Sequence, residues 1–114
     1  MSGGRLDHFL ANLCLLEYIA DRGAIGILAD SQNICFLHQG GEMVLDRQKE
    51  FQYISLIPLD SEIRGVTLSG MKYSLDNAVL YRKIPIGISN EAVSDRISVH
   101  VDSGRALIVY SKDV

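Results

Sequence analysis

The sequence predicts a mainly β fold, in which an antiparallel, jelly-roll-like β-sandwich is preceded by one N-terminal α-helix. Helical spacing of apolar residues is confined to residues 7–21. From Ala24 onward, short β-prone runs are separated by turn residues every eight to twelve positions, which is typical of an antiparallel sandwich or barrel. The 114 residues, 47% of them hydrophobic, are enough for one packed core and too few for two ordinary domains.

The predicted helix runs from Asp7 to Asp21 and ends before Gly23, a residue that commonly follows a helix C-terminus. Its apolar residues surround most of the helix, and such a helix normally lies between two layers. If a longer protein supplies one of those layers, we expect part of the helix surface to be exposed in this chain or covered by another copy. The residues that carry the helical spacing are Leu10, Leu13, Cys14, Glu17 and Tyr18.

The strands are predicted from alternating apolar residues and from the turn residues between them. Gly40-Gly41 and Asp102-Ser103-Gly104 are predicted hairpin turns, which would make the flanking strands antiparallel neighbours. Asp30-Ser31 is a further expected hairpin turn. The predicted strands are Ala24 to Ala29, Asn33 to His38, Glu42 to Leu45, Gln52 to Pro58, Ile63 to Ser69, Ala78 to Tyr81, Arg96 to Val101 and Arg105 to Ser111.

Composition excludes several classes of protein. Charged residues make up 22% without long runs, which argues against disorder, and a net charge of -3 disfavours a nucleic-acid partner. No apolar stretch approaches the ~20 residues of a membrane span, and the N-terminus lacks the pattern of a signal peptide. We therefore expect a cytoplasmic protein without a membrane partner. Cys14 and Cys35 lie in apolar surroundings without metal-site spacing and are predicted to be buried thiols.

The N-terminal segment Gly3-Gly4-Arg5-Leu6-Asp7-His8 is one candidate site. It places two glycines, a guanidinium and a carboxylate just before a helix, where N–H groups and the helix dipole favour phosphate. Arg5 could hold phosphate oxygens, while Asp7 could bind Mg²⁺ or accept a proton from an attacking hydroxyl. On the residues alone, Asp7 is equally a helix N-cap and the glycines a flexible leader.

The segment Gly87-Ile88-Ser89-Asn90-Glu91 is the second candidate site, and it lies between predicted strands. Asn90 both donates and accepts hydrogen bonds, and Ser89 can do either, which suits the ring nitrogens and exocyclic amine of an aminopyrimidine. On the residues alone, a turn in which Ser89 and Asn90 bond their own backbone is the simpler interpretation.

Four segments in order resemble those of the thiamin pyrophosphokinase family. Besides the two candidate sites, Ser55-Leu56-Ile57-Pro58-Leu59 resembles the family's SLIPL, and residues 65–75, GVTLSGMKYSL, resemble its GVTxxGxKYPL. The resemblance implies that residues 24–114 are the thiamin-binding β-sandwich domain and that residues 1–23 end the nucleotide-binding domain or bridge to it. It also implies that Arg5 and Asp7 are catalytic, with Asp7 a metal ligand, and that Ser89 and Asn90 bind thiamin.

The resemblance further implies a homodimeric kinase that transfers pyrophosphate from ATP to thiamin, giving thiamin diphosphate and AMP, with Mg²⁺ neutralising the phosphates. It covers only the second half of such an enzyme, so the chain is interpreted as a fragment without the N-terminal nucleotide-binding domain, and inactive alone. Two positions depart from the family pattern: Ser74 replaces a usual proline, and Ala92 replaces a larger apolar or aromatic residue.

Two other interpretations compete with this one. A free-standing β-sandwich module could bind a ligand or form oligomers without catalysis. An unrelated β-sandwich interaction domain would require four ordered segment matches to be accidental.

Overall fold

The computed structural model describes residues 6–84 and 86–113. One helix precedes the strands, and within the described residues no helix has the length and apolar character needed to cross a membrane. The elements are α1 (Leu6–Asp21), β1 (Ile27–Ala29), β2 (Asn33–His38), β3 (Gly41–Asp46), β4 (Tyr53–Pro58), β5 (Glu62–Ser69), β6 (Leu75–Tyr81), β7 (Arg96–Val101) and β8 (Ala106–Ser111).

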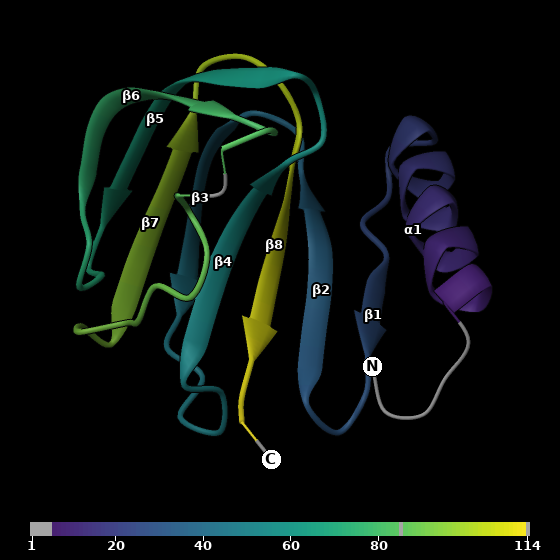
Figure 1. Cartoon of the computed structure of the whole chain (residues 1–114), viewed down its shortest axis with the longest axis horizontal. Coiled ribbons are helices and arrows are strands. Elements are labelled where there is room, and N and C mark those ends of the chain that lie inside the picture. Colours follow the sequence, from purple (N-terminus) through teal and green to yellow (C-terminus); the bar gives the residue numbers. More distant parts are fainter. Residues whose placement is uncertain (1–5, 85, 114) are drawn as a thin grey trace.

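The strands form two four-stranded antiparallel sheets packed face to face, with α1 outside one of them (Figure 1). The strand order is β1-β2-β8-β4 in the first sheet and β3-β7-β5-β6 in the second. Alternation builds the core: in β7, Ile97, Val99 and Val101 are buried between the sheets, while Ser98 and His100 are partly exposed on the outer face. The predicted mainly β sandwich with one N-terminal helix is confirmed.

Helix α1 covers the outer face of the first sheet with only one of its sides. Leu16 and Ala20 are buried against Cys35, Leu37 and Leu107 of β2 and β8. The opposite side of the helix faces outward, where large apolar residues are about half exposed, as expected from its all-round apolar pattern. Those outward residues include Leu15, Tyr18 and Cys14.

The two cysteines therefore differ. Cys35 is a buried thiol, as predicted, and burial raises its pKa to about 11, so that it stays protonated at neutral pH. The prediction of a buried thiol at Cys14 was wrong, because Cys14 lies on the side of α1 that faces away from the sheet.

The strand positions agree with the prediction better than the turns do. Asp30-Ser31 is the expected hairpin turn between β1 and β2, and the Asp30 carboxylate accepts the N–H groups of Gln32 and Asn33, each at 2.8 Å. The bond from Gln32 is the main reason that the pKa of Asp30 lies below its ordinary value. Residues 33–38 and 96–101 are strands with the bounds predicted.

The two predicted glycine hairpins were wrong. The link from β2 to β3 is residues 39–40, with Gly41 the first residue of β3, and the link from β7 to β8 is residues 102–105, yet each link joins strands of different sheets. The partner of β3 is β7, and the partners of β8 are β2 and β4. Turn residues determine the local backbone angles, whereas the burial of the next strand on the opposite sheet determines its partner.

His38 ties the two sheets together near the first of these links. The side chain is fully buried, and its Nε2 lies 3.0 Å from the carbonyl oxygen of Val99 in the other sheet. The N–H of Gly40 donates to Nδ1 at 3.1 Å, so Nδ1 is an acceptor and Nε2 carries the proton. Both ring nitrogens are thus used to fix the crossing from β2 to β3.

Buried thiol and phenol groups predict a loss of stability at high pH. Burial raises the pKa of Cys35 to about 11 and, aided by the nearby Asp46 carboxylate, that of Tyr110 to about 12, from ordinary values of 9.0 and 10.0. The unfolded chain therefore loses these protons first, and stability that is complete below pH 9 falls as the pH rises. We expect a loss of about 3–4 kcal/mol between pH 8 and pH 11.

Urea unfolding at the two pH values measures this loss. A Cys35→Ala/Tyr110→Phe variant is expected to lose clearly less stability over the same range. An equal loss in the variant and the wild type would assign the alkaline effect to other groups.

Candidate functional site

The loop of residues 87–91 is fixed along β4, the edge strand of the first sheet. Ile54 and Asn90 exchange two main-chain hydrogen bonds of 2.8 and 3.0 Å, and the Leu56 N–H donates to the carbonyl oxygen of Gly87 at 2.8 Å. Gly87 lies so close to β4 that an added Cβ would be 2.7 Å from the Leu56 oxygen. The loop therefore continues the sheet beyond β4 instead of standing free in solvent.

Ser89 is held in a strained conformation at the exposed end of this loop. Its φ angle is 61°, in the left-handed region that few residues other than glycine adopt. The hydroxyl of Ser55, itself buried in β4, accepts the Ser89 N–H at 2.9 Å and stabilises this conformation. The Ser89 hydroxyl is left exposed, without a hydrogen-bond partner among residues 6–84 and 86–113. Strain of this kind often marks a functional position.

The Asn90 side chain joins the loop to the turn before β6. Asn90 is only 5% exposed. Its Oδ1 accepts the N–H of Tyr73 at 2.9 Å and that of Glu91 at 3.0 Å, and its Nδ2 donates to the Tyr73 carbonyl oxygen at 2.7 Å. The amide is thus used mainly to hold residue 73 beside the loop.

Main-chain hydrogen bonds extend this junction. The Lys72 N–H donates to the Glu91 carbonyl oxygen at 2.8 Å, and the Val93 N–H donates to the Gly70 carbonyl oxygen at 2.8 Å. Residues 54–56, 70–73 and 87–93 therefore meet in one place, although each belongs to a different segment of the sequence. We call this arrangement the three-segment junction.

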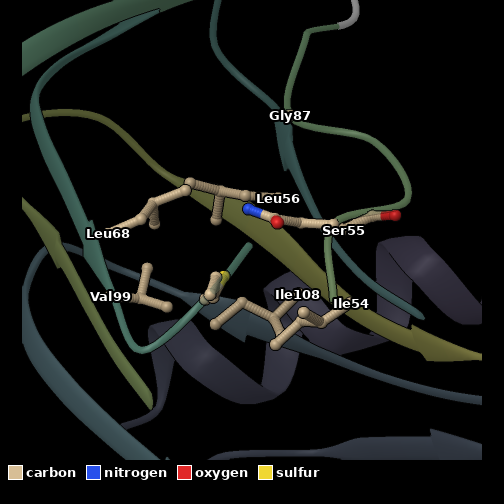
Figure 2. Close-up of a pocket in the computed structure, with 9 residues that line it drawn as sticks. Ile54, Ser55, Leu56, Leu68, Gly87, Val99 and Ile108 are labelled. Carbon is tan, nitrogen blue, oxygen red and sulfur yellow. The ribbon is translucent and has the colours of Figure 1, made fainter. Parts of the chain in front are cut away.

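A small cavity lies beneath the junction, inside the sandwich. Figure 2 shows Leu56 and Ile108 of one sheet and Leu68 and Val99 of the other around it, with Gly87 on the loop. Its volume is about 10 Å³, room for about one water molecule. The cavity is therefore too small for an organic ligand, and only the outer surface of the junction could offer one a binding site.

That outer surface is apolar next to the loop. Ile84, Ile86 and Ile88 are each about half exposed or more. Ile88 and Ile84 also line a shallow hollow with Leu56 and Arg82. We call the three isoleucines the isoleucine rim. Several large apolar side chains exposed beside a strained polar loop are typical of a binding surface.

A larger hollow, of about 530 Å³, lies away from the junction between the edge strands β1 and β3. Apolar side chains line most of it, including the exposed Ile25, Ile27 and Val44. Asp46 and Gln48 are polar residues of its lining. Its volume suits a small ligand, but its walls offer few polar groups to orient one.

Of the two N-terminal candidate residues, only Asp7 can be placed, and it lies away from the junction. Arg5 lies outside the described residues. Asp7 is exposed in the first turn of α1, which lies at the β1–β2 side of its sheet, whereas the loop adjoins β4 at the other edge (Figure 1). Among the described residues, His, Cys, Asp and Glu side chains nowhere form a group that could hold a metal ion, so these residues do not fit a Mg²⁺ site by themselves.

Two junction residues were missed from the sequence. Ser55 supports Ser89 across 34 positions of the chain, and Tyr73 contacts Asn90 across 17. Both residues belong to segments that resemble the family. This resemblance was the only feature of the sequence that could have pointed to them. No local pattern distinguishes Ser55 from an ordinary strand residue.

Comparisons with known proteins identify the family of this chain. A family model described as thiamin pyrophosphokinase, vitamin B1 binding domain, matches residues 42–106, which include the whole junction. A curated relative, thiamine pyrophosphokinase of Bacillus subtilis (strain 168), is 35% identical over 114 residues, or 99% of this chain and 53% of the relative. The chain thus spans about half the length of this relative.

Solved structures have the same fold. The crystal structure of thiamine pyrophosphokinase from Bacillus subtilis superposes with a TM-score of 0.94 at 33% identity, covering 99% of this chain and 53% of that one. The structure of the enzyme from Geobacillus thermodenitrificans gives 0.88 at 32% identity, with 98% and 51% covered. The family model spans more than half of the residues of this chain, and the chain therefore belongs to the family of thiamin pyrophosphokinase vitamin B1 binding domains.

Proposed function

We propose that the chain is the thiamin-binding part of a thiamin pyrophosphokinase, and that thiamin binds on the outer surface of the three-segment junction. The observation that carries this proposal is the geometry of Ser89. An exposed hydroxyl stands on a strained main chain, which the buried Ser55 and Asn90 hold in place. Main-chain bonds to a rigid sheet give this hydroxyl a fixed position, as a specific binding site requires.

The polar groups of the junction suit the aminopyrimidine ring of thiamin. The Ser89 hydroxyl can donate to a ring nitrogen or accept from the exocyclic amine. Asn90 has one amide hydrogen that is not used by Tyr73, but its burial favours a role in positioning the loop. We therefore propose Ser89 as the direct contact. Contact of Asn90 with the ring stays a prediction.

The remainder of the site is proposed to come from other parts of the protein. The cavity beneath the junction has room for about one water molecule, and the isoleucine rim is exposed. Covering the rim would exclude water and complete a pocket. We propose that a second subunit of a homodimer covers it, and that ATP and Mg²⁺ bind outside the described residues, which lack a cluster of metal ligands.

In the proposed reaction, the thiamin hydroxyl receives the pyrophosphate group of ATP, giving thiamin diphosphate and AMP. Such transfers depend chiefly on positioning and on electrostatic stabilisation of the phosphates. Within this protein, the junction would bind and orient thiamin. The chain spans about half the length of its relatives, and its described residues form no group of metal ligands, so the isolated chain is expected to be inactive.

Calorimetric titration with thiamin tests the proposal. We expect weak binding by the chain, unchanged by Mg-ATP. Ser89→Ala is expected to weaken binding about threefold to tenfold, because one hydrogen bond is lost. Ser31→Ala removes an exposed serine in the turn between β1 and β2 and is the matched control. Absence of binding by the wild type, or equal binding by Ser89→Ala, would contradict the proposal.

One observation favours a second function. The 530 Å³ hollow between β1 and β3 could hold an apolar ligand, as a free-standing binding module without catalysis would require. In that case a ligand would perturb Ile27 and Val44 and leave residues 87–91 unaffected. The two functions therefore predict different binding surfaces.

A further inference from the structure

Tyr73 presents an exposed aromatic ring from a main chain that is hydrogen-bonded to the loop of residues 87–91. The residue is 61% exposed. The buried Asn90 amide nevertheless bonds both its N–H, at 2.9 Å, and its carbonyl oxygen, at 2.7 Å. Since Asn90 directly follows Ser89, the same residue fixes the two main-chain segments that carry the hydroxyl and the ring.

Charged side chains next to the ring show what it can attract. The Lys72 Nζ lies 5.5 Å from the centre of the Tyr73 ring, within the range of a cation–π interaction. Lys72 is also 3.9 Å from the carboxylate of Glu91, so its charge is partly balanced there. The Tyr73 ring therefore lies near one ammonium group whose charge is partly balanced by a carboxylate. Such surroundings are compatible with the binding of a second cation, if that cation is flat and stacks on the ring.

Other exposed tyrosines lack this combination. Tyr18 lies on α1, where the Arg22 guanidinium is 4.2 Å from its ring centre and donates to its hydroxyl, so that ring is covered by a cation more closely than the Tyr73 ring is by Lys72. Tyr81 is about half exposed at the far end of β6. Among the exposed tyrosines of the described residues, Tyr73 is the one whose main chain is hydrogen-bonded to the side chain of a loop residue.

We propose that the Tyr73 ring is the platform on which a flat, cationic heteroaromatic ring stacks while Ser89 holds the polar end of the same ligand. Asn90 acts as a positioning residue that sets the distance between the two. This inference rests on the proposed function, in which the ligand is thiamin, whose thiazolium ring carries the positive charge. Tyr73 would thereby discriminate a charged ring from a neutral one of similar size.

Calorimetric titration of thiamin into Tyr73→Ala and Tyr73→Phe variants tests the platform. Alanine is expected to weaken binding about threefold to fivefold, since the ring is lost, whereas phenylalanine is expected to bind within twofold of the wild type. Equal binding by Tyr73→Ala and the wild type would overturn the inference, as would equal weakening in both variants. Failure of the wild type to bind would overturn the proposed function, and this inference with it.

A fluorescent reporter gives an independent measurement. The chain has no tryptophan, so Tyr73→Trp places a single fluorophore at the proposed platform. Thiamin is expected to quench its emission with the dissociation constant found by calorimetry. The matched Tyr81→Trp variant is expected to stay unquenched at the same concentrations. Equal quenching of both variants, or of neither, would overturn the proposal.

Discussion

Replacing Asn90 with alanine is expected to lower the free energy of unfolding by about 2–3 kcal/mol and to remove measurable thiamin binding. The change deletes three hydrogen bonds, two to the main chain of Tyr73 and one from the Glu91 N–H. Because Asn90 is only 5% exposed, the shorter alanine side chain also leaves a buried cavity. Residues 70–73 and 87–91 would lose their common anchor, so that neither Ser89 nor Tyr73 keeps its position.

Urea unfolding and calorimetry measure the two effects. Asn12→Ala, which changes an exposed asparagine on α1, is the control and is expected to alter stability by less than about 0.5 kcal/mol. If Asn90→Ala were as stable as this control and bound thiamin normally, Asn90 would have no positioning role.

Replacing Gly70 with alanine is expected to destabilise the chain by at least about 3 kcal/mol. Gly70 has a φ angle of 78°, and an added Cβ would lie 2.5 Å from the carbonyl oxygen of Arg96 and 3.2 Å from the Cα of Ile97. Both contacts involve main-chain atoms of the central part of the second sheet, which cannot move without breaking its pairing. Since the Gly70 carbonyl oxygen also accepts the Val93 N–H, the junction should be displaced as well.

Gly23→Ala separates the cost of the steric clash from the cost of the positive φ angle. Gly23 has a similar φ angle of 83°, but nothing lies within 4 Å of its added Cβ. Its replacement is expected to cost about 1 kcal/mol, from the backbone angle alone. Equal losses in the two variants, measured by urea unfolding, would show that the close approach of Arg96 has no energetic consequence.

Local patterns predicted strands well and their partners poorly. The alternation of Ile97, Val99 and Val101 identified β7 exactly as the structure has it, because burial on one face imposes a period of two. The start of β6 was placed three residues late, since Asn77 adopts a φ angle of 51° and its N–H bonds to the Thr67 hydroxyl, which breaks the alternation. Pairing across sheets depends on residues far apart in the chain, so the two glycine turns were assigned to the wrong kind of connection.

The candidate site was predicted in part for the same reason. Ser89 and Asn90 were placed in a loop between strands, and the structure agrees. Their supports, Ser55 and Tyr73, are distant in sequence, and only the folded sheet brings them together. Whether Arg5 and Asp7 act on phosphate stays a prediction.

The central claim is that thiamin binds at the three-segment junction, and residue-resolved NMR tests it most directly. In a titration of the isotopically labelled chain with thiamin, amide resonances of residues 54–56, 70–73 and 87–93 are expected to shift together with one dissociation constant. Resonances at Ile27 and Val44 in the hollow between β1 and β3 are expected to stay in place. Shifts confined to that hollow, or none at saturating thiamin, would contradict the account.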